Sequence, residues 1–118
     1  MELTLYDSAG RPVAYSDDGE HIYSFDGRPV AYFHDDSVWS FDGRHLGRFE
    51  SGWVRDNQGN GAFFTESATG GPLKPMRELK PLKGLKQLRP LKALRQLRPL
   101  KPLNSLDWSK LSGEHFFD

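Results

Sequence analysis

The chain of 118 residues contains no cysteine. This absence excludes thiol catalysis, disulfide bonds and cysteine-based metal sites. No apolar run approaches the ~20 residues that a membrane-spanning helix needs. The first residues, Met-Glu-Leu-Thr-Leu, lack the basic start and apolar run of a signal peptide. We therefore expect a soluble, cytoplasmic protein that folds without a covalent or metal staple.

Signatures of catalysis and metal binding are also missing from the sequence. The four histidines show no metal-ligand spacing; they are His21, His34, His45 and His115. No Ser/His/Asp grouping or nucleophile elbow is recognisable. The pairs Asp17-Asp18 and Asp35-Asp36 have the carboxylates that calcium prefers, but aspartate is also an ordinary turn residue. We predict no enzyme, no catalytic residue, no metal and no cofactor.

The zero net charge hides two oppositely charged halves. Residues 1–71 carry twelve acidic and five basic side chains, and residues 72–118 carry four acidic and eleven basic ones. A basic tail of this kind is typical of a segment that binds nucleic acid or an anionic membrane. Because the same chain supplies the opposite charge, docking of the tail on the head is the simpler interpretation.

A repeat organises the first half of the chain. Gly10, Gly27, Gly43 and Gly59 lie 17, 16 and 16 residues apart, and Arg-Pro-Val-Ala-Tyr follows each of the first two. Asp-Gly between β-rich flanks favours a hairpin with a type I′ turn. A lone hairpin is marginally stable in water, so we expect four hairpins around a pseudo-fourfold axis. The prediction is an all-β fold of eight short strands in a closed or flower-like array.

The turn type also predicts which side chains share a face. A type I′ turn at Asp26-Gly27 would place Tyr23 opposite Val30. The larger face then carries Tyr23, Phe25, Val30 and Tyr32, and the smaller one Ile22, Ser24, Pro29 and Ala31. We expect the four aromatic faces to pack together as the core. On this interpretation Tyr15, Tyr32, Trp39 and Trp53 are buried and are not available to stack on sugars or bases.

These repeats resemble a known family. The segments 10–15, 27–32, 45–47 and 52–56, together with Gly70-Gly71-Pro72-Leu73-Lys74-Pro75 and the terminal Trp108 to Phe117, are similar to the bacterial four-fold beta flower domain family. The resemblance covers nearly the whole chain. It implies a fold, but no activity and no catalytic residue. The string Tyr6-Asp7 to Gly10-Arg11 is also similar, in one copy only, to a YD/RHS-type repeat.

From Pro72 the chain reads as triplets, with Leu or Met in the second position and mostly Lys or Arg in the third. A period of three matches polyproline II, which would present a Leu edge, a basic edge and a Pro or small edge. Short helices over 82–89 and 91–98, between the prolines, are the alternative. The predicted units are a hairpin domain at 1–66, a Gly-rich linker at 67–71, the triplet tail at 72–106 and an aromatic anchor at 107–118.

The length of the tail restricts its path. Residues 72–102 as straight polyproline II would run about 96 Å, whereas a head of 71 residues has a radius of gyration of roughly 11 Å. The tail must therefore bend, pair with another chain or project. Exposed leucines would mark an interface.

The sequence assigns no established function. Our first hypothesis is a non-enzymatic structural or protein-interaction module that binds a protein partner or itself through the Leu-striped tail. The alternative is binding of nucleic acid or anionic lipid through Lys74, Lys80, Lys83, Lys86, Arg89, Lys92, Arg95, Arg98 and Lys101. No aromatic lies between residues 72 and 107 to provide a stacking platform. A third hypothesis is a metal- or carbohydrate-binding protein that uses the Asp-rich loops.

Overall fold

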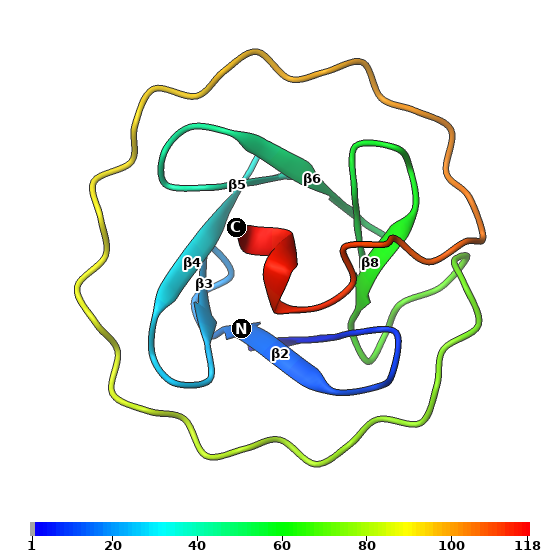
Figure 1. Ribbon diagram of the computed structural model, residues 1–118, viewed down its shortest axis with the longest axis horizontal. Coiled ribbons are helices and arrows are strands. Elements are labelled where there is room, and N and C mark those ends of the chain that lie inside the picture. Colours follow the sequence, from blue (N-terminus) through cyan, green and yellow to red (C-terminus); the bar gives the residue numbers. More distant parts are fainter. Residues whose placement is uncertain (1) are drawn as a thin grey trace.

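The computed structural model describes residues 2–118 and shows a closed, eight-stranded antiparallel barrel (Figure 1). The strands are β1 (Leu3–Tyr6), β2 (Pro12–Ser16), β3 (His21–Ser24), β4 (Pro29–His34), β5 (Ser37–Trp39), β6 (His45–Glu50), β7 (Trp53–Arg55) and β8 (Gly61–Phe64). Each strand pairs with its neighbours in sequence, and β8 closes the barrel on β1. The predicted all-β array of four hairpins is confirmed. Within residues 2–118, no helix has the length and apolar character needed to cross a membrane.

The hairpin turns differ from the predicted type I′. In the second hairpin the Gly27 N–H donates to the Ser24 carbonyl (3.0 Å), and the Ser24 N–H donates to the Arg28 carbonyl (2.9 Å). Gly27 has a positive φ of 98°, whereas Asp26 does not share the left-handed region. This is a type I turn followed by a glycine bulge. The carboxylate of Asp26 accepts the Arg28 N–H (3.2 Å), which holds the aspartate in the turn.

The bulge shifts the pairing next to the turn, so Val30 joins the face of Ile22 and Ala31, and this face is the one inside the barrel. Tyr23 lies opposite Pro29, not Val30, while Ile22 pairs with Ala31. Ile22, Val30 and Ala31 belong to the cluster inside the barrel. The prediction that the aromatics form the shared core is therefore wrong. Besides Phe63, the buried strand residues of the inner cluster are aliphatic: Leu5, Ala14, Ile22, Val30, Ala31, Val38, Val54 and Ala62.

The larger aromatic side chains form three clusters on the outside of the barrel wall. These are Tyr15 with Tyr23 and Phe25, Tyr32 with Trp39 and Phe41, and Tyr6 with Trp53 and Phe64. They are nevertheless buried, with Tyr15 and Tyr32 each 1% exposed. Another part of the chain must therefore cover them.

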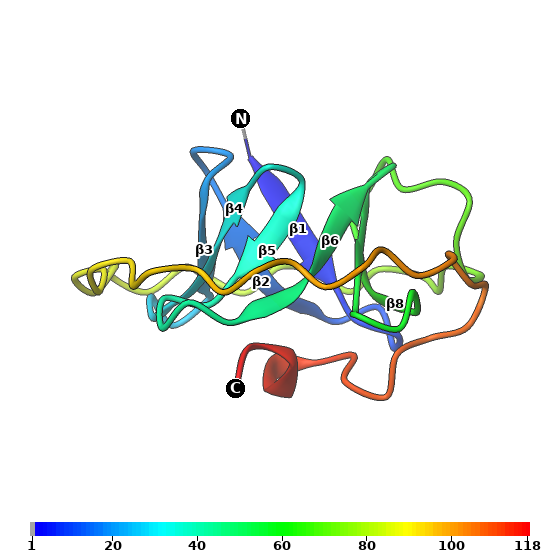
Figure 2. The ribbon, with the colours of Figure 1, turned by 90° about the horizontal axis from the view of Figure 1, so that it is seen from above.

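One end of the barrel is closed by the C-terminus. The short 3₁₀-helix η1 (Glu114–Phe117) brings Phe116 and Phe117 against Phe63 of β8, with ring centroids 5.3 and 5.4 Å apart. Figure 2 shows this helix below the strands. Both phenylalanines join the inner cluster. The opposite end of the barrel has no such plug within residues 2–118.

Residues 72–107, which we call the belt, encircle the barrel (Figures 1 and 2). They contain no helix or strand, so the alternative of short helices over 82–89 and 91–98 is wrong. The molecule measures 36 × 35 Å in the plane of the ring, which gives a circumference of about 110 Å. A polyproline II chain of this length would span about 112 Å. Of the three predicted paths, the tail takes the bent one and makes one full turn around the barrel.

Candidate functional site

Backbone hydrogen bonds fix the belt to the hairpins. The donors and their carbonyl acceptors are Glu78 to Gly10, Gly84 to Phe25, Gln87 to Gly27, Ala93 to Phe41, Gln96 to Gly43 and Ser105 to Gly59, at 2.7–3.0 Å. Every donor is the first residue of its triplet. The remaining first positions within the belt are prolines, which have no N–H to donate. The distribution of proline thus follows the carbonyls that the barrel presents.

The belt has a nine-residue period that matches the four hairpins. Pro-Leu-Lys recurs at 72–74, 81–83, 90–92 and 99–101. The donors to the four hairpin glycines are also nine residues apart. Each nine-residue unit therefore serves one hairpin. The recurrence is visible in the sequence, but the shorter triplet period conceals it.

The hairpin glycines let the belt approach closely. A Cβ on Gly27 would lie 1.9 Å from the Leu85 carbonyl oxygen, and the other three hairpin glycines face the equivalent carbonyls at 2.0–2.2 Å. Any side chain at these positions would collide with the belt backbone. Each of these glycines is required twice, because its φ is also positive.

The basic edge of the belt covers the outer aromatic clusters. Lys83 Nζ lies 4.4 Å from the centre of the Tyr15 ring, and Lys92 Nζ lies 4.7 Å from that of Tyr32. The same cations also contact acidic residues at the end of the barrel. Lys83 Nζ lies 2.8 Å from Glu2, and its hydrogen bond and charge lower the pKa of that carboxyl. Cation–π contacts of this kind contribute about 0.5–1 kcal/mol each at exposed sites.

All nine residues of the possible polyanion site contact the barrel domain or the loop that follows it. Besides Lys83 and Lys92, the contacts are Lys74 with Ala68, Lys80 with Glu66, Lys86 with Asp17, Arg89 with Tyr23, Arg95 with Tyr32, Arg98 with Asp35, and Lys101 with Glu50. The head supplies the countercharge that a polyanion would otherwise supply. This arrangement weakens the polyanion alternative, because a phosphate backbone would have to displace these contacts.

The Leu edge faces solvent. Eleven of the twelve second-position side chains are at least 90% exposed, and Leu106 is 73% exposed. They are Leu73, Met76, Leu79, Leu82, Leu85, Leu88, Leu91, Leu94, Leu97, Leu100, Leu103 and Leu106. We call this set the apolar rim. The packing of residues 2–118 does not use these side chains.

Arg55 closes the ring. Its side chain is buried, with Nη1 donating to the carbonyls of Gly59 and Ser105 (2.8 Å each) and Nη2 to the carbonyl of Gly70 (3.2 Å). Ser105 lies at the end of the belt and Gly70 just before its beginning. One guanidinium therefore joins both ends of the belt to the fourth hairpin. The planar guanidinium directs its N–H donors at all three carbonyls at once, which the single ammonium of a lysine would not do.

The structure brings together three polar side chains, those of Ser37, His45 and Asn57, that the sequence did not reveal. His45 Nε2 lies 2.8 Å from Ser37 Oγ, and His45 Nδ1 lies 2.8 Å from Asn57 Oδ1. The order resembles that of a serine hydrolase triad. However, Ser37 is fully buried and Asn57 carries no charge, so substrate could not reach the hydroxyl. These three side chains instead link β5, β6 and the turn of the fourth hairpin.

Asp17 and Asp18, considered for calcium, have partners within the chain. Asp17 binds Lys86, and Asp18 binds the ring and backbone of His21. Within residues 2–118, no group of three or more potential metal ligands lies together. The aromatics considered for stacking are at most 3% exposed, which confirms that they are buried; they are Tyr15, Tyr32, Trp39 and Trp53.

We predict that Gly27→Ala loosens the belt. The alanine would be strained at positive φ, which costs about 1–2 kcal/mol, and its Cβ would also meet the Leu85 carbonyl oxygen. Gly19→Ala is the matched control, because Gly19 has a φ of 75° and nothing within 4 Å. Urea denaturation should show a clearly larger loss of stability for Gly27→Ala. Equal losses in the free energy of unfolding for the two variants would show that contact with the belt does not restrict the residue at position 27.

Arg55→Met should release the two ends of the belt from the fourth hairpin. Three carbonyls lose a charged donor, and we expect a loss of about 3 kcal/mol or more in the free energy of unfolding. Amide hydrogen exchange at Ser105 should accelerate as the belt end is released. Arg11→Met provides the control, because Arg11 is exposed and its side chain pairs, among residues 2–118, with Asp7 alone; its effect should stay within about 0.5 kcal/mol. Unchanged exchange at Ser105 would contradict the role of Arg55.

His45 should make stability depend on pH. Burial lowers the pKa of His45, the hydrogen bond with Asn57 opposes this, and the charges of Arg48 and Arg98 lower it further. The unfolded chain therefore takes up the proton first, so stability falls as pH drops below the ordinary histidine value of about 6.5. Urea midpoints measured from pH 7 to 5 should decline in the wild type and stay flatter in His45→Gln. Exposed His115 has a raised pKa next to Asp118 and acts with the opposite sign, so His115→Gln should steepen the decline.

Comparison with known proteins agrees with this architecture. No curated protein and no solved structure matches the chain. Nothing in the comparisons supports the similarity to YD/RHS-type repeats. The family described as "4-fold beta flower protein" matches residues 3–117, so the chain belongs to the four-fold beta flower family.

Proposed function

We propose that this protein is a non-enzymatic structural module whose copies associate edge to edge through the apolar rim. The observation that carries the proposal is the orientation of the belt: its cations turn inward to the barrel, and its twelve apolar side chains turn outward. Encircling the barrel requires only the inner edges of the belt. The outer edge is free to be polar, and it is apolar throughout.

The size of the apolar rim supports an interface. Burying one such side chain is worth about 1.5–3 kcal/mol, which at about 25 cal/mol per Å² corresponds to roughly 60–120 Å². The twelve together present about 700–1,400 Å². The largest apolar patch on a typical monomer covers about 300–600 Å². A standard protein interface takes about 800 Å² from each partner, an area that the whole rim matches but that a single arc of three side chains, with about 180–360 Å², does not.

The shape of the rim argues against a membrane as the partner. The side chains lie in one plane and point in all directions around the ring (Figures 1 and 2). A rim one side chain tall does not match a hydrocarbon core of about 30 Å. A flat membrane surface would meet only part of the ring. Attraction to anionic lipid is also weakened, because the basic residues are paired with the head.

A second copy of the chain fits the rim. Successive second-position side chains of a polyproline II chain are about 9 Å apart, and the rim of another copy has the same spacing. Side chains from one rim can thus enter the gaps of the next. Each nine-residue unit presents three apolar side chains, which gives four similar contact arcs. Two convex rims touch along one arc only, so we infer an assembly in which one copy contacts several neighbours.

We expect the wild type to associate with increasing concentration. A variant with all twelve rim residues replaced by Gln should be monomeric, because the barrel contacts use the other belt positions. Replacing one arc, Leu82, Leu85 and Leu88, should weaken association roughly tenfold or more. Sedimentation velocity from micromolar to millimolar concentration measures this. The matched control replaces the same three residues with Met, which keeps the rim apolar and should preserve association.

Two outcomes would contradict the proposal. The first is a wild type that remains monomeric across the whole concentration range. The second is an all-Gln variant that folds, by circular dichroism and thermal melting, and associates as well as the wild type. Retention of the wild type on heparin above physiological salt, lost when the belt cations are neutralised, would instead favour the polyanion alternative.

A further inference from the structure

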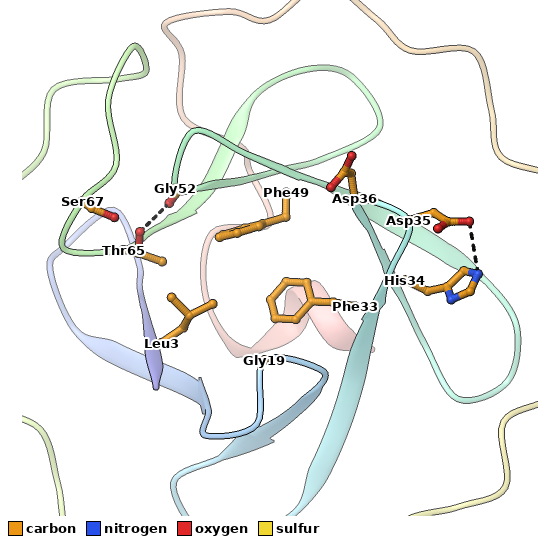
Figure 3. A pocket seen from close by; sticks show the side chains of 10 residues that line it. All are labelled: Leu3, Gly19, Phe33, His34, Asp35, Asp36, Phe49, Gly52, Thr65 and Ser67. Carbon is orange, nitrogen blue, oxygen red and sulfur yellow. Dashed lines mark hydrogen bonds and ion pairs between the residues drawn. The ribbon is translucent and has the colours of Figure 1, made fainter. Parts of the chain in front are cut away.

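The open end of the barrel contains a pocket of about 510 Å³. Leu3 of β1, Phe33 of β4 and Phe49 of β6 form its floor, and Figure 3 shows their side chains converging from three strands. The three are only partly covered by residues 2–118. At the other end of the barrel, Phe116 and Phe117 fill the corresponding space. Residues 2–118 therefore leave one end of the apolar interior open.

The floor is held in place by the turns around the mouth. The Phe33 N–H donates to the Glu20 carbonyl (2.7 Å), and the Phe49 N–H donates to the Asp36 carbonyl (2.8 Å). The two rings lie 5.1 Å apart, at an interplanar angle of 53°. Their geometry is set by backbone bonds across adjacent turns, so the pocket does not require a ligand to form. Its volume lies in the range of about 300–1,000 Å³ typical of small-molecule sites.

The charge at the mouth selects the class of ligand. The residues that line the pocket include Asp35 and Asp36 but no lysine or arginine. Asp35 pairs with His34 at 3.3 Å. The carboxylate of Asp36 has no hydrogen bond or ion pair among residues 2–118. Most other acidic residues of this half of the barrel are paired with the belt, so Asp36 offers an unpaired negative charge in the lining of the pocket that also contains the two rings.

We propose that the barrel mouth binds small organic cations of the aryl- or alkylammonium class. The apolar body of the ligand lies on Leu3, Phe33 and Phe49. Its cationic group lies over the ring faces, whose quadrupole attracts positive charge, and toward Asp36. An anionic ligand of the same size is disfavoured by the two carboxylates at the mouth. The site is separate from the apolar rim, which lies outside the barrel wall.

Two probes of matched shape test the proposal: phenyltrimethylammonium and its neutral isostere, tert-butylbenzene. In NMR titrations of the full chain, phenyltrimethylammonium should give saturable shifts at Leu3, Phe33, Phe49 and Thr65. The neutral probe should bind several-fold more weakly. Asp36→Asn should reduce affinity for the cation several-fold and leave the neutral probe unaffected, while Asp107→Asn, an exposed control on the belt, should change neither.

Phe33→Leu and Phe49→Leu separate the aromatic contribution from simple burial. Both variants keep an apolar floor, and each should weaken binding of the cation about fivefold or more. The absence of saturable shifts with phenyltrimethylammonium would overturn the proposal. So would equal affinity for the two probes combined with no effect of Asp36→Asn, because the pocket would then be apolar without selecting charge.

Discussion

The close contact between the belt backbone and the four hairpin glycines is the constraint on which the other features depend. Because the belt carbonyls lie where a Cβ would be, the turns must carry glycine at Gly10, Gly27, Gly43 and Gly59. A single glycine at positive φ gives a type I turn with a bulge. The large aromatics of the hairpins lie on the outer face of the barrel wall, where the belt provides the cover that keeps them buried. Barrel and belt are therefore one folding unit.

The composition of the belt reduces the cost of ordering so long a segment. Fixing the backbone of one residue costs about 1–2 kcal/mol in conformational entropy. The prolines lower that cost by restricting the unfolded chain, and polyproline II is already a major conformer of unfolded chains. Residues with an N–H occur in the first position of a triplet only where a hairpin carbonyl accepts it. Proline occupies the first positions that have no such acceptor, where it removes no bond.

The sequence predicted the repeat but not the sidedness of the strands. The spacing of the glycines was enough for four hairpins in a closed array, because alternation and turn signals are local. Alternation, however, does not say which of the two faces points inward. The tendency of large aromatics to be buried predicts Tyr23 in the core, whereas in this protein the belt covers Tyr23 from outside the barrel wall. The pocket was not predicted either. Phe33 and Phe49 hold the same place in their repeats, six residues after Gly27 and Gly43, but alternation alone does not show that their side chains meet at one end of a closed barrel.

The fourth hairpin indicates that the two edges of the belt serve separate purposes. Where the other hairpins carry Tyr6, Tyr23 and Trp39, the fourth has Arg55. The facing belt unit changes accordingly, with Asn104 and Asp107 where the other units carry Lys or Arg. The barrel thus supplies the cation and the belt supplies carbonyls and polar groups.

The outward residues of that unit do not change with the inward ones. They remain Leu100, Leu103 and Leu106, although the inner edge has a different chemistry. If the leucines were needed only where the belt covers the aromatic residue of a hairpin, they would not be needed at the unit that faces Arg55. The apolar rim continues around the ring regardless, which is expected when its partner lies outside the molecule.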